Sequence, residues 1–122
     1  MVMPNLLILY VSSPEQSSMF YERLFEKPAD VVLPTWAAFT FDNGLSLGLW
    51  STQAKDFVSN GQNNRTELCF MVTNNEAVEA LYTRWVRAGV EIEQPPKDAV
   101  FGRTFVALDP DGHRLRVCIP DT

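Results

Sequence analysis

The chain has 122 residues, which is enough for one domain with a substantial core. Its net charge is −5, from 10 basic and 15 acidic residues, and it contains no basic run. Because such a surface repels phosphate backbones, nucleic acid is not an expected partner. The first residues lack a basic region before a short, alternating apolar run, so we expect neither a signal peptide nor a membrane span.

The two cysteines, Cys69 and Cys118, show no metal-binding or redox spacing. We therefore expect free thiols in a cytoplasmic protein. No histidine is placed to activate either thiol, so both are expected to behave as small hydrophobic residues rather than nucleophiles.

The first elements are a strand and a capped helix. The apolar run 5–11 predicts the strand. Ser13 is a favourable N-cap and Pro14 suits the first helical turn, so we expect a helix that ends near Phe25. Its buried stripe is predicted to consist of Met19, Phe20, Leu24 and Phe25.

A hairpin is predicted next, because Asp42-Asn43-Gly44 separates the apolar runs 36–41 and 45–50. A two-residue loop would pair Phe39 with Gly48 and place the aromatic side chains on the face of Trp50. A three-residue loop would reverse that assignment, and both registers stay open at this point.

The polar stretch 52–66 predicts a linker, and the run 67–73 predicts a strand with Glu67 on the opposite face from Leu68. Asn74 or Asn75 is expected to cap the following helix.

That helix should run from about Glu76 to Ala88 and stop at Gly89. Its buried stripe is predicted to contain Val78, Leu81, Tyr82 and Trp85. A short strand, 90–93, should then end at Gln94-Pro95-Pro96.

The last hairpin, 101–118, turns at Asp109-Pro110-Asp111-Gly112, where proline and glycine suit a tight turn. The strand after the turn alternates, so Arg114 and Arg116 share a face opposite Leu115 and Val117. A packed core does not accept unpaired guanidinium groups, so the arginine face should meet water or a pocket. His113 is expected to be a solvated turn residue.

The order strand, capped helix, hairpin occurs twice, once on each side of the linker. We therefore predict one α+β domain made of two tandem modules, at about 4–51 and 67–120, joined by the linker 52–66.

The tandem modules, the proline at the start of the first helix and the final hairpin together resemble the vicinal-oxygen-chelate superfamily. The resemblance extends over nearly the whole chain. That superfamily includes glyoxalase I, extradiol dioxygenases, fosfomycin-resistance enzymes and bleomycin-resistance binding proteins. Within it, three stretches are similar to phenazine-antibiotic resistance proteins. They are Pro4-Asn5-Leu6 through Tyr10-Val11-Ser12, Leu49-Trp50-Ser51, and Phe101-Gly102-Arg103-Thr104-Phe105 with Asp109-Pro110-Asp111-Gly112-His113 and Arg116-Val117-Cys118.

The resemblance implies paired β-α-β-β-β modules that form a U-shaped mixed sheet, with helices outside and a cleft inside. It also implies a homodimer whose clefts take residues from both chains. The four metal-ligand positions of the family's enzymes fall on Leu6, Gly48, Glu67 and Arg116. Only Glu67 offers a ligand atom, and a catalytic metal needs about three protein ligands. We therefore expect no metal, no cofactor and no catalytic residue.

What remains is a cleft that binds a small molecule. Gly48 would leave room for a flat ring against the sheet, and Trp50 with Phe39 or Trp36 would stack on it. Glu67 would accept a hydrogen bond from the ligand.

The resemblance also places a loop with Phe101 and Arg103 over the mouth of the cleft. Arg103 and Arg116 would hold a carboxylate or a phenolate. Three structural alternatives stand beside these roles: Trp50 in the core or a dimer interface, Glu67 paired internally with Arg116, and Arg103 on the surface.

These residues leave three candidate functions. The first is a non-enzymatic protein that sequesters a planar aromatic toxin or antibiotic, of the phenazine or bleomycin type. The second is a glyoxalase- or dioxygenase-like enzyme, including a metal-independent one that uses Glu67 as a general base. The third is a structural module that binds no small molecule. The missing metal ligands favour sequestration.

Overall fold

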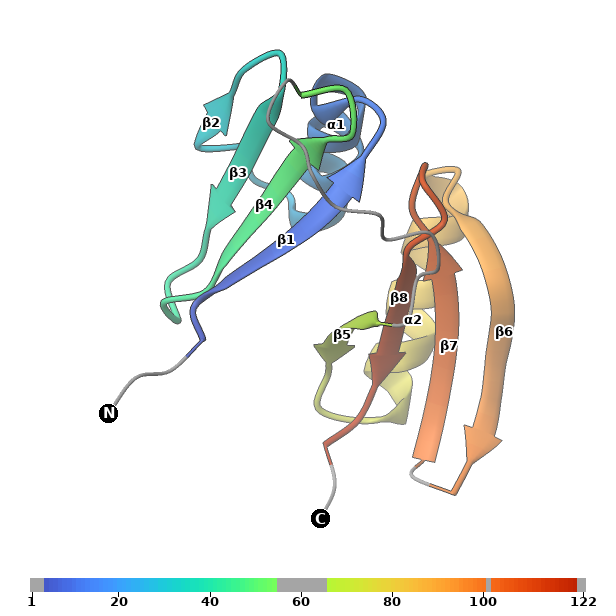
Figure 1. The fold of residues 1–122 in the computed structure, drawn as a ribbon. Coiled ribbons are helices and arrows are strands. Elements are labelled where there is room, and N and C mark those ends of the chain that lie inside the picture. The colour runs from blue at the N-terminus through green and yellow to red at the C-terminus, as the bar shows by residue number, and fades with distance from the viewer. Residues whose placement is uncertain (1–3, 55–65, 101, 121–122) are drawn as a thin grey trace. The chain divides into compact units, whose positions relative to one another are not determined.

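The computed structural model describes residues 4–54, 66–100 and 102–120. The chain divides into two units, Met1–Asn60 and Gly61–Thr122. Each unit contains one helix and one four-stranded mixed sheet (Figure 1). The predicted α+β class and the repeated order of elements are confirmed. Most of the predicted linker, 55–65, lies outside the described residues.

The first unit consists of β1 (Leu6–Val11), α1 (Pro14–Phe25), β2 (Val31–Val32), β3 (Trp36–Thr40) and β4 (Ser46–Ser51). Its strands lie in the order β1-β4-β3-β2, with β1 parallel to β4 and the other pairs antiparallel. Because two parallel neighbours need a crossover, α1 and the β2–β3 segment connect β1 to β4.

The helix α1 begins and ends as the sequence predicts. Ser13 is extended, and its Oγ accepts a hydrogen bond from the N–H of Gln16 at 3.2 Å. Its buried stripe differs from the prediction, because Met19 is 64% exposed whereas Tyr21 is fully buried. At about 100° per residue, positions two apart lie nearly opposite each other, so a helix that buries Tyr21 must expose Met19.

The β3–β4 hairpin has a three-residue loop. The N–H of Phe41 donates to the carbonyl of Leu45 at 2.9 Å, and Gly44 takes a φ of +90° in the loop between them. Phe39 therefore pairs with Leu47, and Ala38 pairs with Gly48. The two-residue alternative is wrong.

Phe39 consequently lies on the helix-covered face of the first sheet. Its side chain is fully buried, and its ring centre is 5.0 Å from that of Phe25 in α1. The loop length alone decides this, because a one-residue shift moves every side chain of a strand to the other face. As a residue of the core, Phe39 does not join Trp50.

The second unit consists of β5 (Glu67–Met71), α2 (Asn75–Arg87), β6 (Glu91–Ala99), β7 (Gly102–Leu108) and β8 (Arg114–Cys118). The strand order is β5-β8-β7-β6, with β5 parallel to β8. Asn74 is the helix cap, since its Oδ1 accepts from the N–H of Ala77 at 2.8 Å. Trp85 packs edge-on against Phe105 and Phe70 in the core.

β6 is longer than the sequence predicts, because it continues through Pro95 and Pro96 to Ala99. It is the last strand in the sheet order, and its register against β7 shifts twice, between Ile92 and Gln94 and between Gln94 and Lys97. An edge strand with bulges tolerates residues that lack an N–H, which explains why the prolines do not end it.

The β7–β8 turn has the predicted geometry but a buried histidine. The N–H of Gly112 donates to the carbonyl of Asp109 at 3.0 Å, with φ of +84° at Gly112. His113 is 7% exposed, and its Nδ1 lies 2.7 Å from Oδ2 of Asp109. The expectation of a solvated turn residue is wrong, because the buried Asp109 carboxylate gives the imidazole a partner.

Neither helix within the described residues is long and apolar enough to cross a membrane.

Candidate functional site

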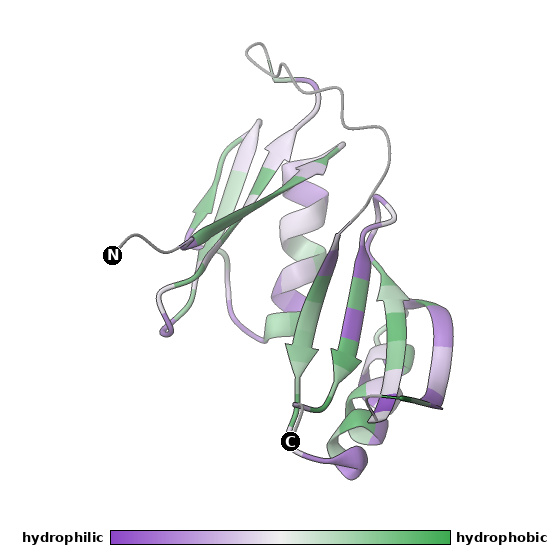
Figure 2. Ribbon diagram, turned by 60° about the horizontal axis from the view of Figure 1, so that its bottom comes forward, coloured by the Kyte–Doolittle hydropathy of each residue, from purple (hydrophilic) through white to green (hydrophobic). Residues whose placement is uncertain are grey.

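Each sheet has one side covered by its own helix and one side that faces away from that helix. In the first sheet, the strand alternation and register place nine residues of β1, β3 and β4 on the side away from α1. Six of them, which we call the aromatic face, are Leu6, Ile8, Tyr10, Trp36, Gly48 and Trp50, and the other three are the small or polar Ala38, Thr40 and Ser46. Figure 2 shows the hydrophobic character of β1, which contributes three residues of the aromatic face.

The aromatic side chains of this face come from three strands. Trp36 of β3 pairs with Trp50 of β4, and Tyr10 of β1 pairs with Trp50 from the other side. The ring centres of Tyr10 and Trp50 are 6.4 Å apart, with an angle of 65° between the ring planes. Both tryptophans stay partly exposed, and Tyr10 is 37% exposed. The face therefore presents aromatic surface without an ionised group.

Gly48 lies beneath Trp36. A β-carbon at Gly48 would lie only 2.8 Å from Cζ3 and 2.9 Å from Cζ2 of the Trp36 indole, and still closer to Cη2. The sequence predicted that Gly48 leaves room for a flat ring of a ligand. The structure places a flat ring of the protein there instead.

The second sheet presents a different surface on the side away from α2, which we call the charged face. Its polar residues and cysteines are Glu67, Cys69, Thr104, Arg114, Arg116 and Cys118, and the apolar Met71, Val106 and Leu108 lie on the same side of the sheet. Figure 2 shows the corresponding alternation of hydrophilic and hydrophobic residues along β8.

Glu67 and Arg116 form a two-pronged ion pair on this face. Nε and Nη2 of Arg116 donate to the two carboxylate oxygens of Glu67 at 2.9 and 3.0 Å. Nη1 of Arg116 also donates to Oγ1 of Thr104 at 3.0 Å, and that hydroxyl donates to the carbonyl of Val117 at 2.7 Å. The internal pairing of Glu67 with Arg116, which the sequence left open, is therefore present.

The pairing changes the protonation of its members. The hydrogen bond from Arg116 holds the pKa of Glu67 below its ordinary value, although partial burial acts in the opposite direction. Burial and the nearby carboxylate of Glu67 raise the pKa of the Cys69 thiol. The charged face therefore carries an ionised carboxylate and a protonated thiol at neutral pH, and neither is a good general base or nucleophile.

Arg103, a predicted ligand residue, lies on the opposite side of the second sheet. Its Nε donates to Oε1 of Glu79 in α2 at 2.7 Å, and its Nη1 lies 3.3 Å from Oδ1 of Asp98. The guanidinium is thus held near the helix, away from Arg116. Arg103 belongs to strand β7, so the predicted position on a loop is wrong for this residue. Phe101, predicted with it, lies outside the described residues.

The four positions implied for a metal are placed equivalently in the two units. Leu6 and Gly48 lie on diagonally adjacent positions of parallel neighbours, as do Glu67 and Arg116. Leucine and glycine side chains provide no ligand atom, and both oxygens of Glu67 are hydrogen-bonded to a guanidinium. Across residues 4–54, 66–100 and 102–120, no group of three His, Cys, Asp or Glu side chains is arranged to hold a metal. The residues present do not fit a catalytic metal.

Sequence reasoning missed Ile8 and Tyr10 as members of the aromatic face. The signal was present, because Leu6, Ile8 and Tyr10 alternate with the more buried Leu7, Leu9 and Val11.

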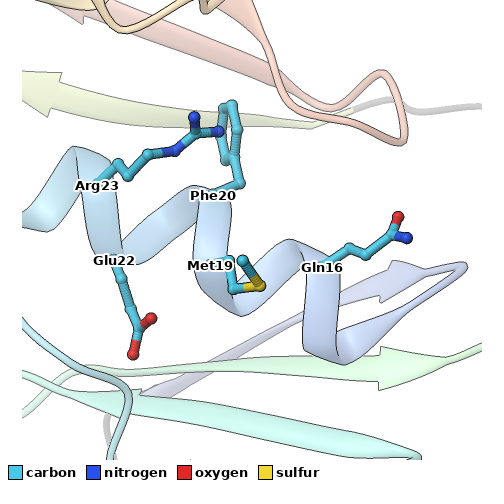
Figure 3. Close-up of a pocket in the computed structure, with 5 residues that line it drawn as sticks. All are labelled: Gln16, Met19, Phe20, Glu22 and Arg23. Atoms are coloured by element: carbon cyan, nitrogen blue, oxygen red, sulfur yellow. The ribbon is translucent and has the colours of Figure 1, made fainter.

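A hollow of about 500 Å³ lies against the outer surface of α1, lined by Gln16, Met19, Phe20, Glu22 and Arg23 (Figure 3). Its two charged residues are already engaged. The carboxylate of Glu22 accepts from the N–H of Ala29 at 2.8 Å, and the guanidinium of Arg23 lies 5.8 Å from the ring centre of Phe20. Figure 3 shows Phe20 and Arg23 together on the side of the helix away from Glu22. The hollow lacks the convergent polar groups typical of a ligand site.

A family-wide comparison and a comparison with individual proteins indicate the same family. Residues 4–117 match the family described as the Glyoxalase/Bleomycin resistance protein/Dioxygenase superfamily. The chain is 34% identical over 121 residues to the phenazine antibiotic resistance protein EhpR of Enterobacter agglomerans, covering 96% of this chain and 92% of that one.

Two solved structures are similar over most of the chain. Protein ATC0852 of Agrobacterium tumefaciens, solved by solution NMR, is 37% identical, with 100% of both chains covered and a TM-score of 0.87. A glyoxalase-related enzyme of Fulvimarina pelagi is 21% identical, with 98% of this chain and 89% of that one covered and a TM-score of 0.83. At that identity, the second likeness concerns the fold alone.

Proposed function

Because the chain belongs to the glyoxalase/bleomycin resistance protein/dioxygenase superfamily, we propose that it is a cytoplasmic, non-enzymatic protein that binds and sequesters a planar aromatic toxin of the phenazine type. The superfamily contains both binding proteins and enzymes, so the choice between them depends on the residues of this chain. The name of the EhpR relative supports the ligand class.

The observation that carries the proposal is the aromatic face. Trp36, Trp50 and Tyr10 lie together on it, and the four strands of the first sheet contain no Asp, Glu, Lys, Arg or His. Each stacked aromatic pair contributes roughly 0.5–1.5 kcal/mol beyond the burial of apolar area. A flat ligand that contacts two of these rings therefore gains affinity without any need for a charged anchor.

The charged face argues against the enzymatic alternative. A general base works best with a pKa near the working pH. The carboxylate of Glu67 has a lowered pKa and gives both oxygens to Arg116. Metal-independent proton abstraction by Glu67 would first require that this ion pair open.

Sequestration would lower the free concentration of the toxin in proportion to the protein present. It needs no turnover, so the bound compound should be recovered unchanged. This feature separates the proposal from a lyase or an oxidoreductase.

The test is a titration of the purified protein with phenazine, followed by quenching of tryptophan fluorescence. We expect saturable quenching near one phenazine per chain, because the two tryptophans of the aromatic face would contact the ligand. Trp50→Ala should weaken binding, whereas Trp85→Phe should preserve it, since Trp85 is 2% exposed in the core of the other unit.

Two further measurements complete the test. Mass spectrometry of the extracted ligand should show unchanged phenazine, and elemental analysis should show no stoichiometric metal. Absence of quenching together with stoichiometric Ni, Zn, Fe or Mn would overturn the proposal and return the chain to the enzymes of its superfamily.

A further inference from the structure

Gly48 occupies an unusual position, because it is buried in the middle of β4. A glycine inside a strand costs about 0.5–1 kcal/mol relative to alanine, since it has more conformational freedom to lose. Gly44, Gly89, Gly102 and Gly112 all have positive φ values that favour glycine, but Gly48 does not. Its presence therefore needs a steric reason rather than a conformational one.

The indole of Trp36 supplies that reason. Three atoms of its benzo ring lie where any β-carbon at position 48 would clash, so the ring contacts the backbone of β4 directly. Trp36 does not pair with Gly48 in the ladder. It pairs with Trp50, and its side chain leans along the sheet over the neighbouring Ala38–Gly48 pair. This position is possible only because Gly48 has no side chain.

We propose that Gly48, because it has no side chain, lets the Trp36 indole pack against the sheet. We propose also that this packed indole is the surface that selects a flat, fused-ring ligand. The proposal rests on the proposed function and deepens it by naming the selecting residue and the ligand shape. A ring held against the backbone has lost its rotamer freedom before the ligand arrives, so binding does not have to order it.

The neighbouring side chains restrict the ligand further. Trp50 and Tyr10 continue the aromatic face beyond Trp36, with Tyr10 edge-on to Trp50. A fused-ring compound can lie along these rings. A twisted compound of two separately rotating rings cannot contact them with both rings at once.

The experiment is a double-mutant cycle on Gly48 and Trp36, with phenazine as the fused-ring probe and 2-phenylpyridine as the twisted probe. Gly48→Ala should weaken phenazine binding by about tenfold or more, because the added methyl group displaces the indole. It should also shrink the ratio between the dissociation constants of the two probes.

The second half of the cycle isolates the role of Trp36. In a Trp36→Ala background, Gly48→Ala should change phenazine binding by less than about twofold, because its partner is already absent. Ser46→Ala is the matched control, since Ser46 lies on the same strand and the same side of the sheet. It should leave both probes unaffected.

A measurement without ligand tests whether Trp36 packs on Gly48. With Trp50→Phe and Trp85→Phe, the fluorescence reports Trp36 alone, and Gly48→Ala should shift its emission to longer wavelength as the indole leaves the sheet. If Gly48→Ala does not fold, as judged by circular dichroism, the binding of the two probes to Trp36→Ala tests whether Trp36 selects the ligand. Loss of discrimination between the probes would then support the proposal, and unchanged discrimination would overturn it.

The outcomes are distinct. If the unmutated protein binds neither probe, the proposed function fails and the selection fails with it. If it binds phenazine but Gly48→Ala leaves the phenazine affinity, the discrimination between probes and the emission unchanged, only the proposed role of Gly48 in positioning Trp36 is overturned. An equal loss of phenazine affinity from Gly48→Ala with and without Trp36 would also overturn that role.

Discussion

At the scale of single residues, the best-defined polar interaction is the pair Glu67–Arg116. The sequence placed both residues on one face of the second unit, and the structure shows that they satisfy each other. Two hydrogen bonds between a planar guanidinium and a carboxylate give the pair a defined geometry. Their side chains are 34% and 22% exposed, so solvent screens the interaction and its contribution to stability is modest.

Arg116→Met should therefore destabilise the fold by about 0.5–1 kcal/mol at pH 7. The folded-state pKa of Glu67 lies below its ordinary value of 4.5. The stability from the pair is thus fully present above pH 4.5 and is lost as the pH falls through the folded-state pKa. Urea unfolding of both proteins, at pH 7 and at steps down to pH 3, should show that their difference shrinks in acid.

Lys97→Met, which removes an exposed positive charge from β6, is the control for a general effect of net charge. A difference between the wild type and Arg116→Met that stayed constant from neutral to acidic pH would contradict the role assigned to Glu67.

At the scale of elements, the β7–β8 turn depends on a single buried carboxylate. Oδ1 of Asp109 accepts from the N–H groups of Asp111 and His113 at 3.0 and 2.8 Å, and Oδ2 contacts the His113 ring. The side chain of Asp109 has no exposed surface. The loop of the first hairpin, at Asp42-Asn43-Gly44, is exposed, so the two hairpins close by different means.

Asp109→Ala should cost about 2–3 kcal/mol, because it leaves several buried donors without an acceptor. Asp42→Ala, the matched change in the other hairpin, should cost less than about 0.5 kcal/mol, as is usual for exposed positions. Thermal and urea unfolding of the two variants measure the difference. Similar losses for both would show that the buried network does not hold the β7–β8 turn.

At the scale of the whole molecule, the two units share an order of elements but carry different surfaces. The aromatic face of the first sheet has no ionised group, whereas the charged face of the second holds the Glu67–Arg116 pair. The family positions for metal ligands are divided between these two surfaces, two on each. These positions therefore carry residues without a ligand atom in the first unit and an ion pair in the second.

We also propose that the chain forms a homodimer. Three consecutive apolar side chains on and beside the edge strand β2, Val31, Val32 and Leu33, are 40%, 47% and 53% exposed. Exposed apolar surface of this kind is typical of an interaction site. Sedimentation equilibrium should give twice the chain mass of 13.8 kDa at micromolar concentration. A single species of 13.8 kDa over the whole concentration range would contradict the proposal.

The sequence by itself determined the elements whose signals are local. Ser13 and Asn74 cap their helices because a side-chain oxygen next to the first turn needs no distant partner. The turns at Gly44 and Gly112 follow from residues that tolerate positive φ. The repeat of elements, and with it the α+β class, follows from the order of these local signals. The face shared by Glu67 and Arg116 follows from strand alternation combined with the family resemblance.

Only the tertiary structure decided how these elements face one another. The loop length of the first hairpin sent Phe39 into the core, and the rotation of α1 buried Tyr21 instead of Met19. Arg103 forms an ion pair with Glu79 of α2, and the indole of Trp36 packs on Gly48. Each of these outcomes depends on packing between residues distant in sequence or on a one-residue change of register. Local propensity differs too little between the alternatives to choose among them, whereas burial of whole side chains differs by kilocalories.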